Sequence, residues 1–326
     1  SLQDQATQAW QRLLEFQNGN TDILGNYARF LHKERKDYDE AEKLYRQAIA
    51  ADPQHANNLG NFAIFLTSIR KDHVEAEKFY RQAIAADPQH ANNLGNFANF
   101  LTDIRKDHDA AEKLYRQAIA AEPKNIAVLG NFANFLAEIR KDYDEAEKFY
   151  KLLIEANPQH ANNLARFAYF LAEIRKDYDE AEKYHRQAIA AAPKNVAVLG
   201  QFAIFLTNIR KDHVEAEKFY RQAIAADPQH ANNLGNFAGF LFAQGQVVEG
   251  SEFLIRAISA APSEQALLAE LHFYAYAHRW KEDDQALARL KGVLLSGGRS
   301  PGWPLDRNVQ QAAIQGHPHI NLVRAL

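Results

Sequence analysis

The chain has 326 residues, a formal net charge of −3 and no cysteine. The lack of cysteine excludes disulfides, cysteine nucleophiles and thiolate metal sites, and the near-neutral charge disfavours a nucleic-acid-binding face, which needs unbalanced Lys and Arg. No apolar run approaches the length of a membrane span and the N-terminus has no signal-peptide pattern, so we expect a soluble, cytoplasmic protein.

Residues 1–18 are expected to form one helix. Three of its apolar positions match three positions in the second helix of the repeated unit that follows: Ala6 with Ala41, Trp10 with Tyr45 and Leu13 with Ala48. We therefore interpret residues 1–19 as an N-terminal cap or as the remnant of an upstream repeat.

Residues 20–262 hold seven copies of one unit, which predicts a repeat architecture. Apolar residues recur at helical spacing in both halves of the copy at 55–89, so each unit is expected to be two amphipathic helices. A period of about 35 residues is typical of a solenoid, in which each repeat covers its neighbour. Six prolines mark the period: Pro53, Pro88, Pro123, Pro158, Pro193 and Pro228.

A capping box is expected where each second helix begins. Asp72 is followed three residues later by Glu75, so the aspartate should accept from a free backbone N–H while the glutamate reaches back to the cap. After Asp107 the third residue is Ala110, so only the aspartate half is expected there. The complete pairing recurs at Asp37/Glu40, Asp142/Glu145, Asp177/Glu180 and Asp212/Glu215.

The unit resembles the tetratricopeptide repeat family in its small and large positions, which are met by Ala63, Ala76, Tyr80, Ala83 and Pro88. The resemblance implies an all-α, right-handed superhelical solenoid of helical hairpins whose first helices line a concave groove. One departure is that the unit is a residue longer than usual, because the stretch 69–71 lengthens the first helix. Only the last copy returns to the shorter spacing.

Residues 263–326 are expected to close the solenoid. The helical pattern weakens after residue 262, yet apolar spacing still indicates one helix around Leu271 and another around Leu290. We interpret the segment as a degenerate eighth hairpin followed by a C-terminal helical cap.

The polar arc of the first helices carries asparagine in register. An asparagine offers both a donor and an acceptor, so a ladder of them can hold the backbone of an extended peptide. The pattern is similar to the asparagine ladder in the repeats of O-GlcNAc transferase. The alternative is that these amides cap or bridge neighbouring helices. One column is Asn26, Asn61, Asn96, Asn131, Arg166, Gln201 and Asn236, and the other is Asn57, Asn92, Asn162 and Asn232.

A further groove position differs between copies and is expected either to set specificity or to reflect drift: Arg29, Ile64, Asn99, Asn134, Tyr169 and Ile204. The first copy is basic at Arg29, His32 and Lys33, and the middle copies are acidic at Asp103, Glu138 and Glu173. Phe242, Phe273 and Tyr276 are expected to give the last part an aromatic lining. The predicted ligand therefore has an acidic segment toward the N-terminal end and an apolar anchor toward the C-terminal end.

The predicted function is a protein-interaction scaffold that binds a peptide segment of a partner and has no catalysis, cofactor or metal. No nucleophile elbow or phosphate loop is present, and the histidines repeat along the chain rather than converge. End-to-end self-association is possible in such an array. Two alternatives stay open. One is a sensing or regulatory arm of a larger protein, whose effector domain lies elsewhere or whose own tail, around Trp303, fills the groove. The other is an RNA-binding helical repeat.

Overall fold

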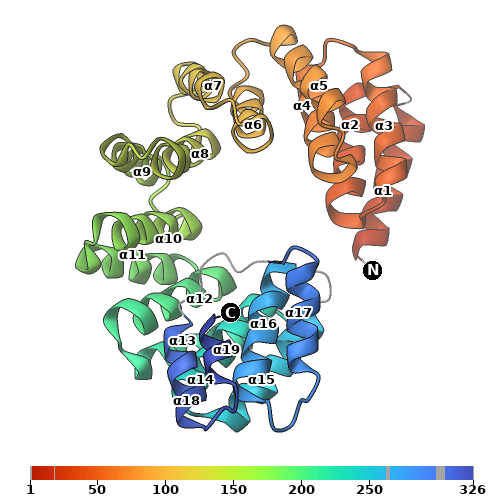
Figure 1. Ribbon diagram of the computed structural model, residues 1–326. Helices are drawn as coiled ribbons and strands as arrows, with labels where there is room; N and C mark the ends of the chain where they lie inside the picture. The colour runs from red at the N-terminus through yellow and green to blue at the C-terminus, as the bar shows by residue number, and fades with distance from the viewer. Residues whose placement is uncertain (1, 18, 262–264, 299–304, 326) are drawn as a thin grey trace. The chain divides into compact units, whose positions relative to one another are not determined.

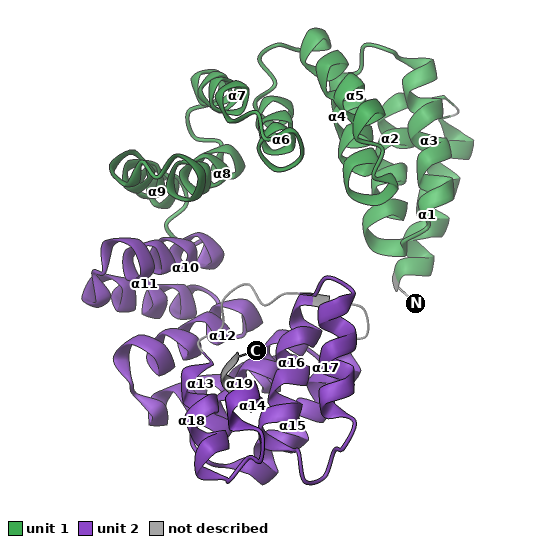
Figure 2. Cartoon of the chain, viewed as in Figure 1, with its two compact units in different colours: residues 1–158 green, residues 159–326 purple. Residues whose placement is uncertain are grey.

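The computed structural model describes residues 2–17, 19–261, 265–298 and 305–325, and the regular structure of these residues is all-α. The chain divides into two compact units, residues 1–158 and residues 159–326 (Figure 2). The expected all-α class, with helices in repeated hairpins, is confirmed in both units.

Unit 1 contains the single helix α1 (Leu2–Phe16) and four hairpins (Figure 1). Each first helix ends in a π-helical segment before the chain turns into the second helix. The first helices and their π segments are α2 (Thr21–Phe30) with η1 (Leu31–Arg35), α4 (Ala56–Phe65) with η2 (Leu66–Arg70), α6 (Ala91–Phe100) with η3 (Leu101–Arg105), and α8 (Ile126–Phe135) with η4 (Leu136–Arg140). The second helices are α3 (Tyr38–Ala51), α5 (His73–Ala86), α7 (His108–Ala121) and α9 (Tyr143–Ala156).

Unit 2 continues the pattern and then departs from it. Its first helices are α10 (Ala161–Phe170) with η5 (Leu171–Arg175), α12 (Val196–Phe205) with η6 (Leu206–Arg210), and α14 (Ala231–Ala243) without a π segment. Their partners are α11 (Tyr178–Ala191), α13 (His213–Ala226) and α15 (Val247–Ala260). The last helices are α16 (Gln265–His278), α17 (Ala286–Leu295), α18 (Asp306–Ile314) and α19 (Ile320–Ala325). Helix α18 packs on α14 and α16.

The core runs through each unit as a series of aromatic contacts. Phe62 of α4 is fully buried, with its ring centroid 5.7 Å from that of Tyr45 and 4.9 Å from that of Phe79. Ala63 and Ala76 are also fully buried and keep the paired helices close. Burying one such phenylalanine contributes about 1.5–3 kcal/mol. The predicted apolar stripes therefore form the core.

The extra residue of the 35-residue unit is accommodated by the π segment. Lys71 adopts a left-handed conformation with φ of 58°, and its N–H donates to the carbonyl of Leu66, five residues earlier. The N–H of Asp72 donates to the same carbonyl at 3.2 Å. A π turn holds one more residue than an α turn, so the helix lengthens without a gap. Helix α14 belongs to the shorter copy, where Gly245 with φ of 78° makes the turn.

The capping boxes are confirmed for the aspartate and wrong for the glutamate. Asp72 accepts from the N–H of Glu75 at 2.9 Å, and Asp107 accepts from that of Ala110 at 3.1 Å. The Glu75 carboxylate does not turn back, because the Asp72 N–H already has its partner in the π segment. It pairs instead with Arg46 of the preceding second helix.

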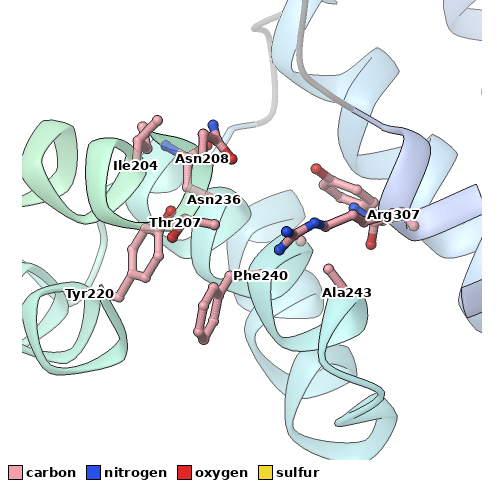
Figure 3. Close-up of a pocket in the computed structure, with 11 residues that line it drawn as sticks. Ile204, Thr207, Asn208, Tyr220, Asn236, Phe240, Ala243 and Arg307 are labelled. Carbon is pink, nitrogen blue, oxygen red and sulfur yellow. The ribbon is translucent and has the colours of Figure 1, made fainter. Parts of the chain in front are cut away.

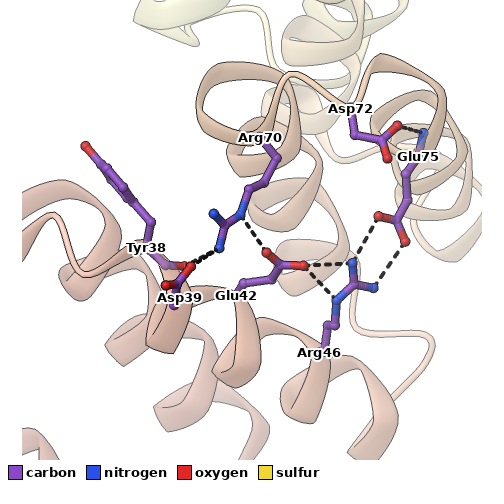
Figure 4. A network of polar contacts seen from close by, with 7 residues as sticks. All are labelled: Tyr38, Asp39, Glu42, Arg46, Arg70, Asp72 and Glu75. Atoms are coloured by element: carbon purple, nitrogen blue, oxygen red, sulfur yellow. Dashed lines mark hydrogen bonds and ion pairs between the residues drawn. The ribbon is translucent and has the colours of Figure 1, made fainter.

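Arginine–carboxylate pairs join successive second helices. Glu42 of α3 accepts from Arg46 on its own helix and from Arg70 of η2, and Arg46 also reaches Glu75 of α5 (Figure 4). Pairs equivalent to that between Arg70 and Glu42 join Arg105 to Glu77, Arg140 to Glu112 and Arg210 to Glu182. Exposed pairs contribute at most about 1 kcal/mol each, so they fix register more than stability.

Candidate functional site

The first asparagine column lies on the exposed side of the first helices. Its seven residues, named here the ladder face, are Asn26, Asn61, Asn96, Asn131, Arg166, Gln201 and Asn236; all are exposed or half-buried. Asn61, for example, is half-buried, whereas its neighbours Gly60 and Phe62 are buried. Within the part of the chain that the structure describes, none of the seven side chains has a hydrogen-bond partner. Their donors and acceptors are therefore open to a ligand.

The second column behaves differently from the ladder face. Asn57, Asn92, Asn162 and Asn232 are all exposed at the start of their helices. However, Asn92 accepts from the side chain of Asn125, and Asn162 accepts from that of Asn195, both at 3.0 Å. For these two residues, the alternative that an amide bridges neighbouring repeats therefore holds.

A third asparagine column was missed, and it is buried. Asn93 donates its side-chain N–H to the backbone carbonyl of Ala56 at 2.9 Å. It fills the space above Gly60, where any Cβ would overlap its side chain. Asn58 and Asn233 donate to the carbonyls of Thr21 and Val196 in the same way, above Gly25 and Gly200. The recurrence of glycine two residues after the buried asparagine was the available signal, because glycine permits close approach of a neighbour.

The groove position that differs between copies, named here the variable column, is mixed in its exposure to solvent. Arg29 is exposed and Tyr169 is 60% exposed, whereas Ile64 and Ile204 are half-buried. The side-chain oxygens of Asn99 and Asn134 accept from the hydroxyls of Tyr115 and Tyr150 on the facing second helices. These two asparagines therefore help to hold their hairpins together and leave only their N–H groups for a ligand.

The expected aromatic lining at the C-terminal end is wrong. Phe242 is fully buried and stacks on His278, with ring centroids 4.4 Å apart, and Phe273 is only 4% exposed. Helix α14 is covered on additional sides because α16 and α18 pack on it. Its aromatic residues therefore belong to the core. Neither Phe242 nor Phe273 therefore offers an exposed aromatic surface to the apolar anchor predicted for the ligand.

Unit 1 contains a hollow that joins residues from two columns. It has a volume of about 270 Å³ and lies between the third and fourth hairpins, where Asn131 of the ladder face meets Asn99 and Asn134. Asp103 and Glu138 also line it, and both are exposed. The acidic character expected for the middle copies thus lies beside the ladder amides. At the other end of the same unit Arg29 and Lys33 are exposed, so the two ends carry opposite charge.

A similar hollow in unit 2 is occupied by the chain itself. Arg307 of α18 points toward Thr207, Asn236 and Phe240 (Figure 3). Its Nη1 lies 3.2 Å from Nε2 of His213, which therefore accepts as a neutral ring. Burial lowers the pKa of His213, and the charge of Arg307 lowers it further. The expected tail residue Trp303 lies outside the described residues.

Two other properties bear on the class of site. Among the described residues, no three His, Cys, Asp or Glu side chains are grouped to hold a metal ion. None of the described helices has the length and apolar character needed to cross a membrane.

Three family models match the chain. Two are described as tetratricopeptide repeat and match residues 4–56 and residues 32–92 with 104–174. The third, the middle TPR-like domain of cilia and flagella-associated protein 70, matches residues 164–289. Together these models span residues 4–92 and 104–289. No curated protein sequence matches the chain.

Two solved structures share the fold. PilF of Pseudomonas aeruginosa is 19% identical with a TM-score of 0.50, over 70% of this chain and 95% of PilF. Yeast Tom70 is 18% identical with a TM-score of 0.64, over 90% of this chain. The chain corresponds to 59% of Tom70. At these identities the likeness concerns the fold alone.

Proposed function

We propose that this chain, which belongs to the tetratricopeptide repeat family, is a protein-interaction scaffold that holds an extended or helical segment of a partner on its ladder face. The observation that carries the proposal is the contrast between the asparagine columns. In the buried column, Asn58, Asn93 and Asn233 donate to backbone carbonyls of the preceding hairpin. The ladder face repeats in register yet makes no hydrogen bond inside the described chain, so its recurrence supports an external use.

The ladder amides suit a peptide backbone. Each amide matches one N–H or C=O of an extended segment, and one such hydrogen bond contributes about 0.5–1.5 kcal/mol. A ladder of this kind supplies affinity without reading side chains. Specificity then falls to the variable column and to the charges beside it, with Arg29 and Lys33 suited to an acidic stretch of the partner. No catalytic role is part of the proposal.

The test compares two triple variants of the full chain. The first is Asn61→Ala, Asn96→Ala and Asn131→Ala on the ladder face. The matched control is Gln82→Ala, Gln117→Ala and Gln222→Ala, which removes three exposed amides from second helices. Partners are captured from the native source by the unmodified chain, cross-linked and mapped, and each variant is then titrated with the mapped segment.

We expect the ladder variant to weaken binding at least tenfold, with the glutamine variant unchanged. Cross-links that map to the second helices, together with equal affinity of both variants, would contradict the proposal. A steep salt dependence with RNA in a filter-binding assay would instead favour the RNA-binding alternative.

One observation favours a second candidate. Helix α18 lies on α14 and α16, so part of the chain's own tail covers the first helices of the last hairpins. This arrangement supports a regulatory arm in which an internal segment competes with a partner. Deletion of residues 296–326 tests it: under this candidate, affinity for the mapped partner segment rises, and unchanged affinity contradicts it. End-to-end self-association stays a prediction, checked by the molar mass in solution.

A further inference from the structure

The hollows of unit 1 and unit 2 occupy the same position of the repeat. Eight of the nine residues that line the hollow of unit 1, all but Ile139, have a counterpart 105 residues later, three repeat lengths away, that lines the hollow of unit 2. The pairs that matter are Asp103 with Asn208, Tyr115 with Tyr220, Asn131 with Asn236, and Glu138 with Ala243. The backbone therefore builds one kind of hollow twice, with different charges on its wall.

The hollow of unit 2 shows what kind of side chain fits. Arg307 enters it from α18 (Figure 3). Its guanidinium donates to Nε2 of His213 at 3.2 Å. Asn308 beside it is buried and bonded to His278 at 3.1 Å, so α18 is held in place. The wall offers an arginine only neutral groups, because Asn208 and Ala243 stand where unit 1 has carboxylates.

The hollow of unit 1 has the same wall with two negative charges added. Asp103 and Glu138 are exposed, and neither is paired with a cation in the described part of the chain. Carboxylates on the second helices, such as Glu77 and Glu112, are paired with arginines. Unit 1 also repeats the histidine: His108 packs against Phe135 as His213 packs against Phe240, with ring centroids 6.3 Å and 6.0 Å apart.

We infer that the hollow lined by Asp103, Asn131 and Glu138 is a binding subsite for an arginine side chain of the partner segment. The inference rests on the proposed function and names one feature of the partner. A guanidinium carries five N–H donors in a planar fork, which suits the two carboxylates and the amide oxygen of Asn131 that line this hollow. Charge-assisted hydrogen bonds of this kind are about twice as strong as neutral ones.

The test uses two synthetic pentapeptides and the full chain. One is acetyl-Ala-Ala-Arg-Ala-Ala-amide, and the other carries citrulline, which has the same shape without the charge. Their dissociation constants are measured by ligand-observed NMR titration. The test variant is Asp103→Asn with Glu138→Gln. The control is Glu155→Gln with Glu252→Gln, which removes the same charge from exposed positions on second helices.

We expect the unmodified chain and the control variant to bind the arginine peptide at least tenfold more tightly than the citrulline peptide. In the test variant this ratio should fall close to one. If the double substitution prevents folding, Glu138→Gln alone should lower the ratio at least threefold.

Two results overturn the inference: no measurable binding of the arginine peptide, or equal ratios in the test and control variants. Neither result bears on Asn61 and Asn96, which do not line this hollow, so the proposed function is judged separately by the alanine variants of these two residues.

Discussion

The hairpins around α6 to α9 and those around α12 to α15 share a backbone pattern, yet an additional helix covers only the second group in the described structure. One position shows why. Gly239 of α14 stands where Asn134 stands in α8, and a Cβ at Gly239 would lie 2.5 Å from the hydroxyl of Tyr274. The missing side chain lets α16 approach, whereas Asn134 accepts from Tyr150 instead. The glycine at this position therefore leaves room for Tyr274 of α16 against α14.

The largest effect is expected for Gly239→Asn, which gives α14 the residue of α8. The new side chain overlaps Tyr274, and forcing extra atoms into a packed site costs about 1–3 kcal/mol, with the upper end expected here. Urea unfolding gives the free energy, and hydrogen exchange shows whether α16 and α18 open first. The matched change Asn134→Gly should cost less, because it removes one hydrogen bond, worth about 1 kcal/mol, from a helix that no added element covers. Equal losses would contradict the comparison.

An effect of similar size is expected from pH at His185, which stands in α11 where other second helices have a tyrosine. Tyr115 and Tyr220 hold this position, but α11 has His185, which is 2% exposed and whose pKa burial lowers to about 4. The folded chain therefore binds a proton at His185 less readily than the unfolded chain does. Its stability is complete above pH 6.5 and falls as the pH drops toward 4, by about 3 kcal/mol for this group.

The variant His185→Tyr should remove that part of the acid sensitivity. Urea unfolding at pH 7 and pH 4.5 measures the difference between the two proteins. His278, whose pKa burial also lowers to about 4, is present in both and cancels. A variant that loses as much stability in acid as the original chain would show that His185 is not responsible.

The smallest effect is expected at the turns. Lys106 has φ of 58° after a π segment, while Gly245 takes the equivalent left-handed turn in the shorter copy. A left-handed conformation costs a residue with a side chain roughly 1–2 kcal/mol. Glycine avoids this cost, but part of the gain is lost because glycine is more flexible than other residues in the unfolded chain. Lys106→Gly should therefore stabilise by up to about 1 kcal/mol, and Gly245→Lys should destabilise by a similar amount, both measured by urea unfolding. Loss of stability in Lys106→Gly would mean that the lysine makes contacts that outweigh its backbone strain.

Much of the fold could be predicted because the pattern is local. The spacing of Phe62, Ala63, Ala76 and Tyr80 predicts which sides of two helices are apolar, and those sides are buried. The prediction that the first helix is longer than usual is also correct. The π geometry at Leu66 could not be predicted, because it depends on where the second helix must begin in order to pack.

The candidate site could be predicted only in part. The exposure of Asn61 and Asn96 follows from helical spacing, whereas the burial of Phe242 and Phe273 does not, since it results from α16 and α18 packing on α14. The buried role of Asn93 depends on Gly60 in the preceding hairpin. Its exposed neighbour Asn92 has the same side chain and a different task. Spacing within one helix cannot separate the two.

The sequence by itself determined the all-α class, the hairpin repeat and the polar arc of the first helices, because these depend on residue spacing along single helices. Only the tertiary structure decided which asparagines are used between hairpins and that α18 brings Arg307 into a hollow. It also decided that two carboxylates in the equivalent hollow of unit 1 have no cation partner among the described residues. Those outcomes depend on which elements meet, and contacts between residues far apart in the chain leave no periodic mark in the sequence.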